Sequence, residues 1–210
     1  LLHLNWLYLY PIQPSRELMD SSCQDAILRL QRRLKKMPSA LVAFSGGVDS
    51  AVLLKAAQLT LKDKVVALTA TSPTFPPEEL DLAKRMALDW GVRHILVASH
   101  ELDREGYVNN AGDRCFHCKT ELFELARKKA AELGIRHILD GCNLDDMGEH
   151  RPGLIAAKEA NVCHPLVEAQ MTKSMVRQVA KQWQIPVWDK PAFACLGSRF
   201  PVGTSVTVEP

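Results

Sequence analysis

Short apolar runs alternate with longer segments in which apolar residues recur at helical spacing, and this alternation constrains the fold most strongly. The apolar runs are residues 40–44, 65–68, 94–97 and 137–140. The helical segments are residues 23–37, 51–59, 76–90, 118–133 and the stretch from Thr172 to just before Pro186. Strands joined through helices pair in parallel by right-handed crossovers. We therefore predict an α/β fold, with a doubly wound, mostly parallel sheet covered by helices on both faces.

The bulk composition is that of an ordinary globular chain. Its 210 residues suffice for one good-sized core, and it has 24% charged and 47% hydrophobic residues. The net charge of +2 and a single short basic run at residues 32–36 give no reason to expect a nucleic-acid partner. Residues 1–12 are apolar but too short for a membrane span and lack the features of a signal peptide. Six cysteines without framework spacing indicate reduced thiols, so we expect a cytoplasmic protein.

The loop after the first apolar run predicts a phosphate site. Residues 45–50 read Ser-Gly-Gly-Val-Asp-Ser and lead directly into a helix. Glycines let a ligand approach the main chain, and the free amides of a helix start attract an anion. Neither the G-x-x-x-x-G-K-[ST] spacing nor the G-x-G-x-x-G spacing is present. The loop therefore predicts phosphate binding of a different type from either of those motifs.

An acidic residue beside phosphates calls for a cation. Asp49 lies within the phosphate loop, and Asp145 and Asp146 follow the fourth apolar run, at the same predicted edge of the sheet. We expect Mg²⁺ at Asp49, because Mg²⁺ is usually held by one or two carboxylates together with phosphate oxygens. Asp145 or Asp146 could complete this metal site or could instead cap a helix.

The loop and several later motifs carry a family resemblance. Ser-Gly-Gly-Val-Asp-Ser after an apolar strand resembles the signature of the PP-loop ATP pyrophosphatases, which grip the pyrophosphate portion of ATP. The second half resembles the LarE family, a group of ATP-dependent sacrificial sulfur transferases. The segments that carry this likeness are residues 114–119, 140–146, 151–153, 164–169, 172–173 and 188–203. The likeness runs from about Ala40 to Val208.

The resemblance implies a role for each matched residue. Cys195 would be the sulfur donor. The residues implied to bind ATP are Ala43, Ser45, Gly46, Gly47, Asp49, Ser50 and Gly141. The residues implied to bind substrate are Arg114, Lys119, Ser198 and Arg199. The implied reaction thiolates a pyridinium dicarboxylate mononucleotide during synthesis of the nickel-pincer nucleotide cofactor, and the implied assembly is a homo-oligomer.

The chemistry of Cys195 depends on forming a thiolate. A cationic neighbour lowers the pKa of a thiol, and Arg199 and Lys190 are nearby in sequence. The alternative is a small, buried apolar residue, the usual fate of an unpaired cysteine. A polar, proline-rich setting between Asp189 and Pro201 favours the functional interpretation. Some relatives hold an iron–sulfur cluster on three cysteines here, whereas this chain has only Cys195 between residues 191 and 203, so we expect a single-turnover enzyme.

The sequence differs from the family pattern at two positions near Cys195. Gly197 and Val202 stand where the family pattern suggests serine and tyrosine. We expect residues 1–22 to be an extension outside the core, 23–190 the PP-loop domain, and 191–210 the sulfur-donor loop with the start of a carboxyl-terminal segment that is missing.

The pair Cys115 and Cys118 could be half a zinc site, a redox dithiol or simply packed side chains. Rival functions are an amidating synthetase, a tRNA thiolase and a non-catalytic nucleotide-binding module.

Overall fold

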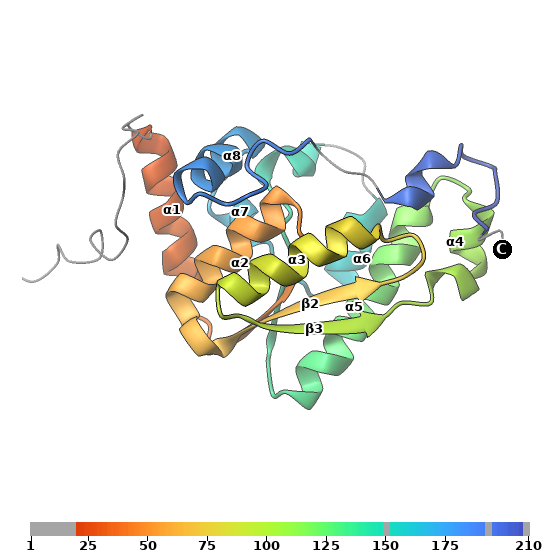
Figure 1. Cartoon of the computed structure of the whole chain (residues 1–210), viewed down its shortest axis with the longest axis horizontal. Coiled ribbons are helices and arrows are strands. Elements are labelled where there is room, and N and C mark those ends of the chain that lie inside the picture. The colour runs from red at the N-terminus through yellow and green to blue at the C-terminus, as the bar shows by residue number, and fades with distance from the viewer. Residues whose placement is uncertain (1–19, 149–151, 192–194, 208–210) are drawn as a thin grey trace, which may run out of the picture.

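Four parallel strands form the centre of the molecule (Figure 1). The computed structural model describes residues 20–148, 152–191 and 195–207. The strands are β1 (Ala40–Ala43), β2 (Val65–Thr71), β3 (Arg93–Ala98) and β4 (His137–Leu139), in the order β3-β2-β1-β4. In the register, Ala40 lies opposite both Val65 and His137. The predicted parallel α/β fold is confirmed.

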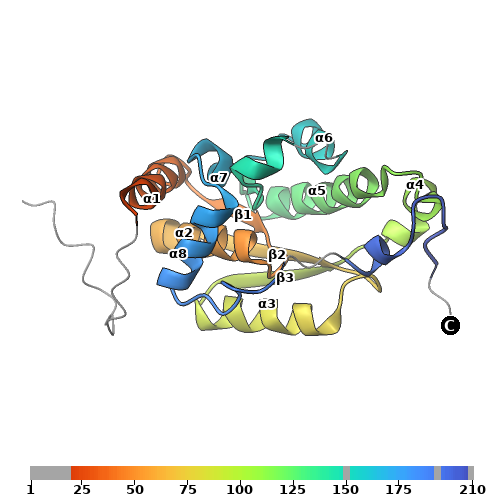
Figure 2. The ribbon, with the colours of Figure 1, turned by 90° about the horizontal axis from the view of Figure 1, so that it is seen from above.

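Helices cover both faces of the sheet, because successive strand residues point to opposite sides. The helices are α1 (Ser21–Leu34), α2 (Val48–Leu61), α3 (Pro77–Asp89), α4 (Glu105–Asn109), α5 (Arg114–Glu132), α6 (Pro152–Glu159), α7 (Pro165–Glu168) and α8 (Lys173–Gln182). One core joins Ala40 and Val42 to α1, α2, α3 and α8, and a second joins Leu41 and Ala43 to α5 and α6. Figure 2 shows α3 and α5 on opposite sides of the sheet.

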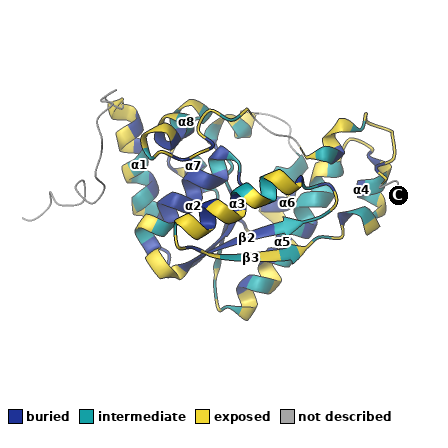
Figure 3. Cartoon of the chain, viewed as in Figure 1, coloured by how far each residue is buried: buried dark blue, intermediate teal, exposed yellow. Residues whose placement is uncertain are grey.

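Local sequence explains where the outer helices start. The Asp20 side chain accepts a hydrogen bond from Ser22 N and caps α1, whose Cys23, Ala26 and Leu30 are fully buried. Thr172 caps α8 by accepting from Met175 N at 3.3 Å. The predicted domain boundary at residue 22 therefore falls within the first turn of α1, and residues 1–19 lie outside the described residues. Figure 3 shows the buried residues concentrated in β2 and α2, with exposed residues along the outer face of α3.

Helix α5 begins one turn earlier than its apolar spacing predicts, at Arg114 rather than Cys118. Cys115 and Cys118 therefore both lie on the helix, three positions apart, which places them on one face. Of the motif residues, Arg151, Ala192, Ala194 and Val208 lie outside the described residues. Within the described ranges, none of the helices has the length and apolar character that a membrane crossing requires.

Candidate functional site

The phosphate loop connects β1 to α2 and leaves the start of α2 open to an anion. Ser50 Oγ donates to Gly47 O at 3.0 Å and lies 3.2 Å from Ser45 Oγ, so the two hydroxyls brace the loop from within. Gly47 is the N-cap of α2 and, having no side chain, caps none of its amides. The first N–H groups of α2 can therefore bind a phosphate, as the sequence predicts.

Two glycines of the predicted ATP site are required by close packing. Gly46 has φ of +80°, and a Cβ there would lie 3.2 Å from the Cβ of Ala83 on α3. A Cβ on Gly141 would lie 2.7 Å from Ser50 N. The main chain after β4 therefore rests directly on the first turn of α2, and the phosphate loop is held between α3 and the β4 loop.

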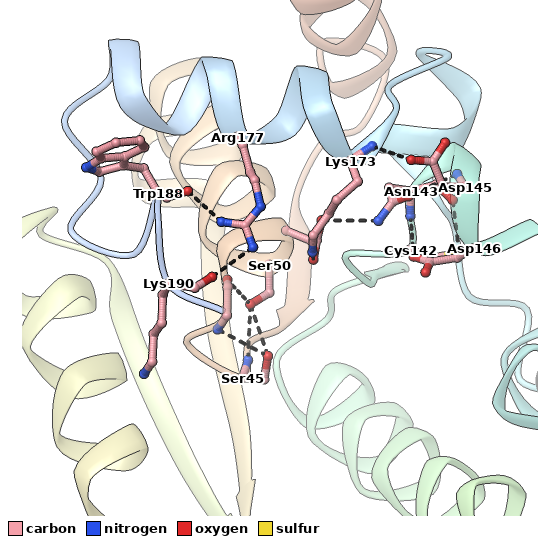
Figure 4. Close-up of polar contacts among 12 residues, drawn as sticks. Ser45, Ser50, Cys142, Asn143, Asp145, Asp146, Lys173, Arg177, Trp188 and Lys190 are labelled. Atoms are coloured by element: carbon pink, nitrogen blue, oxygen red, sulfur yellow. Dashed lines mark hydrogen bonds and ion pairs between the residues drawn. The ribbon is translucent and has the colours of Figure 1, made fainter. Parts of the chain in front are cut away.

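A closed ring of hydrogen bonds links the phosphate loop to α8 (Figure 4). Asn143 Nδ2 donates to Asp49 Oδ1 at 3.1 Å, and Asn143 Oδ1 accepts from Asp145 N at 3.0 Å. Asp145 Oδ2 then accepts from Lys173 N at 2.9 Å, and the Lys173 ammonium forms an ion pair with Asp49. Asn143 and Lys173 stood within the family-like motifs, but the sequence alone assigned them no role.

The acidic residues predicted to bind metal have different partners. Asp49 is paired with Lys173, Asp145 with the main chain of Lys173, and Asp146 Oδ2 accepts from Asn143 N at 3.0 Å. Nowhere in residues 20–148, 152–191 or 195–207 are three acidic, histidine or cysteine side chains gathered as metal ligands. Asp49 offers the hard oxygen ligands that Mg²⁺ prefers, beside the phosphate site, so its role in holding a metal–phosphate complex stays a prediction. Asp145 and Asp146 accept hydrogen bonds from main-chain N–H groups, but neither is the helix N-cap of the alternative interpretation, since Thr172 caps α8.

A carboxylate–imidazole pair, with the carboxylate buried and the imidazole half-buried, lies beside the loop after β4. Asp140 Oδ1 accepts from His164 Nδ1 at 2.6 Å and from Cys142 N at 3.1 Å. The hydrogen bond to Asp140 raises the pKa of His164 above its ordinary value, against the opposing effect of burial. The pKa of Asp140 is lowered: burial acts to raise it, but the bond from His164 and the charge of Lys119 outweigh that effect. The two side chains therefore form a charged pair that orders this edge of the sheet.

This pair predicts a pH-dependent stability. A histidine with a raised pKa contributes fully below its unfolded pKa of about 6.5, and the contribution is lost as pH rises through its folded pKa. We expect His164→Gln to cost about 1–3 kcal/mol near pH 6, and less near pH 9. Urea unfolding of both proteins across this range measures the difference. His137→Gln, at the opposite end of β4, is the control, and an equal cost of His164→Gln at both pH values would contradict the prediction.

Cys195 lies on an exposed turn that is fixed to the loop after β2. Leu196 N donates to Thr74 O at 3.1 Å, and Ser198 donates to Cys195 O through its main-chain N at 2.9 Å and its Oγ at 2.6 Å. Ser198, predicted to bind substrate, therefore shapes the Cys195 turn. Arg199 is exposed on the same turn. Lys190, expected near the thiol, is instead paired with Glu79 on α3.

Gly197 is required where the family pattern suggests serine. A Cβ there would lie 2.6 Å from the Tyr107 hydroxyl, so the turn packs directly on this buried side chain. Tyr107 donates to Thr74 Oγ1 at 3.4 Å, and Thr74 donates to the buried Glu101 at 2.8 Å. Burial raises the pKa of Tyr107 to about 12. The phenol is therefore neutral at physiological pH and supports the Cys195 turn.

Cys118 on α5 lies near enough to Cys195 for the charge of one to act on the other, which the spacing of the sequence did not reveal. Burial raises the pKa of Cys118 to about 12, and the charge of Glu101 adds to this rise, as negative charge on Cys195 or Cys115 would. The Cys118 thiol is therefore protonated, whereas Cys195 is exposed. The cysteines between residues 191 and 203 do not include Cys118, because α5 is distant in sequence.

The predicted substrate residues on α5 lie in two settings. Arg114 Nη1 donates to Asn110 Oδ1 at 2.8 Å, and Asn110 Nδ2 donates to Pro201 O at 2.7 Å and Thr204 O at 3.0 Å. Arg114 thus braces the segment that follows Cys195. Lys119 lies beside the Asp140 carboxylate, whose pKa it lowers, and its ammonium is 5.5 Å from the centre of the Phe123 ring. Substrate contacts of these residues stay predictions.

Curated proteins are similar to this chain over most of its length. An uncharacterised protein of Synechocystis is 43% identical over 180 residues, covering 86% of this chain and 67% of that protein. The pyridinium-3,5-bisthiocarboxylic acid mononucleotide synthase of Lactiplantibacillus plantarum is 35% identical over 175 residues, covering 83% of this chain and 63% of the synthase. The chain thus spans about two thirds of the length of these relatives. No protein-family model matches it.

Solved structures share the fold. An NMN synthetase from Francisella tularensis superposes with a TM-score of 0.66 at 18% identity, over 82% of this chain and 76% of that one. The NH3-dependent NAD synthetase of Campylobacter jejuni gives 0.65 at 17% identity, over 80% and 75%. A U34-tRNA thiolase from Methanococcus maripaludis gives 0.57 at 14% identity, over 84% and 71%. With this shared fold and 35% identity to the L. plantarum synthase, which is a LarE protein, the chain belongs to the LarE family of the PP-loop ATP pyrophosphatase superfamily.

Proposed function

We propose that this chain is an ATP-dependent sulfurtransferase that adenylates a carboxylate of a pyridinium dicarboxylate mononucleotide and transfers to it the sulfur of Cys195. One observation carries the proposal. The exposed Cys195 turn is attached to the loop after β2, and the phosphate loop follows β1. Because the carboxyl ends of parallel strands meet at one edge, the thiol and the phosphate site lie at the same edge of the sheet. The activity for which the L. plantarum relative is named, synthesis of a bisthiocarboxylic acid mononucleotide, supports the same substrate class.

ATP activates the substrate at the phosphate loop. The free amides at the start of α2, with the hydroxyls of Ser45 and Ser50, bind the pyrophosphate portion of ATP. Mg²⁺, when bound, neutralises phosphate charge, and Asp49 is the residue that would hold it. A carboxylate oxygen of the substrate attacks the α-phosphorus, the bond to the β-phosphate oxygen breaks, and pyrophosphate leaves. The product is an acyl adenylate.

Cys195 then supplies sulfur in two steps. Its thiolate attacks the acyl carbon, AMP leaves with the electron pair of the broken C–O bond, and a thioester joins substrate to protein. A base next removes the Cα proton of Cys195. The electron pair of that C–H bond forms the Cα–Cβ double bond, and the Cβ–S bond breaks with its electrons remaining on sulfur. The substrate leaves as a thiocarboxylate, the protein keeps dehydroalanine, and no oxidant or reductant is needed.

The test is the intact mass of the protein before and after incubation with ATP, Mg²⁺ and the pyridinium dicarboxylate mononucleotide. We expect loss of one hydrogen sulfide, mapped by peptide analysis to Cys195, with one AMP formed for each protein converted. Incubations that omit ATP or the mononucleotide are the controls. We expect the whole protein to perform this reaction in the cytoplasm as a homo-oligomer.

Two outcomes would contradict the proposal in different ways. AMP release with an unchanged Cys195 would point to an amidating enzyme or to an external sulfur source. Stoichiometric iron and labile sulfide in the purified protein, lost on replacing Cys115 or Cys118, would contradict the single-turnover form, because a cluster could renew the sulfur. Binding of ATP without release of pyrophosphate would instead indicate a nucleotide-binding module.

A further inference from the structure

The side chain of Arg177 reaches from α8 to the chain that leads to Cys195. Its Nη1 donates to Trp188 O and its Nη2 to Lys190 O, each at 2.8 Å. Figure 4 shows the guanidinium of Arg177 between these two carbonyls, with Ser45 and Ser50 of the phosphate loop nearby. A planar guanidinium can bind two acceptors at once, which a lysine ammonium does less well. Arg177 therefore fixes both the position and the direction of the 188–190 turn.

Other contacts hold the same turn from outside. The Lys190 ammonium pairs with Glu79 on α3, and the Lys181 ammonium lies 5.4 Å from the centre of the Trp188 ring. The main-chain oxygen of Glu79 would lie 3.4 Å from a Cβ on Gly46, so this ion pair adjoins the phosphate loop. The 188–190 turn is thus fixed to α8 on one side. On the other side it is fixed to Glu79 of α3, which adjoins the phosphate loop.

Helix α8 also contacts the phosphate loop, through the same face that carries Arg177. Lys173, four positions before Arg177, forms the ion pair with Asp49 of the phosphate loop. Residues four apart on a helix lie one above the other on one face. That face therefore joins the residue beside the ATP phosphates to the turn that precedes Cys195.

The 188–190 turn also restrains the position of Cys195. Lys190 and Cys195 are five positions apart and can be separated by at most about 18 Å. Immediately beyond Cys195 the chain is fixed by the hydrogen bond from Leu196 N to Thr74 O. Thiol attack on an adenylate requires the reacting atoms to come within about 3–3.5 Å of each other, so small errors of placement are costly. We propose that Arg177 is a positioning residue for sulfur transfer, which holds the Cys195-bearing segment in register with the ATP site. This inference rests on the proposed function.

The experiment separates the two half-reactions in a single turnover. Pyrophosphate release reports adenylation, and conversion of Cys195 to dehydroalanine, followed by mass, reports sulfur transfer. For Arg177→Met we expect a pyrophosphate burst within about twofold of the parent protein and sulfur transfer slower by about 100-fold, the cost of a displacement of about 1 Å. Arg177→Lys retains the charge and one donor, so we expect a loss of about tenfold. Arg85→Met, an exposed arginine on α3, is the matched control.

The outcomes distinguish this inference from the function on which it rests. A parent protein that never converts Cys195 would overturn both. Conversion by the parent and by Arg177→Met at equal rates would overturn the positioning role alone. Equal slowing of adenylation and sulfur transfer, in Arg177→Met or in the milder Arg177→Lys, would mean a general structural role and would also overturn it.

Discussion

Replacing Cys195 by alanine is expected to abolish formation of the thiolated product while pyrophosphate is still released. The exposed thiol supplies both the nucleophile and the transferred atom, so its removal should slow sulfur transfer by more than about 1,000-fold, as with other covalent nucleophiles. ATP binding should not change, because the phosphate loop is built from residues that follow β1. Single-turnover assays of pyrophosphate, AMP and thiocarboxylate measure the three steps.

Further cysteine variants sharpen this prediction. Cys195→Ser keeps a nucleophile but cannot deliver sulfur, so an ester could form without any thiolated product. Cys163→Ala, whose thiol lies 3.9 Å from Arg33 Nη2 away from the Cys195 turn, is the matched control. Cys118 is protonated because burial raises its pKa to about 12, so Cys118→Ala should still complete one turnover. Thiolated product from Cys195→Ala would show that the sulfur comes from elsewhere.

The strands and the phosphate loop could be predicted because their signals are local. Each strand is a short apolar run, and the loop between β1 and α2 is a contiguous motif. The helices α4 and α7 could not, since they have five and four residues, too few to show helical spacing. α4 ends at Asn109, and the C-cap residue Asn110 has a left-handed backbone.

The candidate site was predictable only where one segment carries it. Gly141 and Asn143 meet Ser50 and Asp49 because β4 lies beside β1, and that strand order is a property of the whole sheet. The proximity of Cys118 to Cys195 likewise depends on the docking of residues 195–207 against α4. Val206 N donates to Val108 O at 2.9 Å and Gly203 N to Asn110 O at 2.9 Å, contacts between segments almost a hundred residues apart. A pattern within one segment of the sequence does not predict contacts between two distant segments.

Gly141→Ala is expected to disrupt the nucleotide site more than a methyl group added at any other position of that site. The new Cβ would lie 2.7 Å from Ser50 N and 3.0 Å from the carbonyl carbon of Asp49, both main-chain atoms of the first turn of α2. Neither can move without shifting the amides that face the phosphate. Overpacking of this kind costs about 1–3 kcal/mol of stability. Displacement of the amides by about 1 Å should also weaken adenylation by about 100-fold.

A nearby glycine provides the control for this variant. Gly148 closes the short helix Leu144–Gly148 in the same loop, and a Cβ there would have no neighbour within 4 Å. Gly148→Ala should therefore match the parent protein both in urea unfolding and in ATP-dependent pyrophosphate release. If Gly141→Ala instead bound ATP and released pyrophosphate like Gly148→Ala, the contact between the β4 loop and α2 would not set the geometry of the phosphate site. The expected result, loss of adenylation in Gly141→Ala alone, would mean that the β4 loop determines where the phosphate-binding amides point.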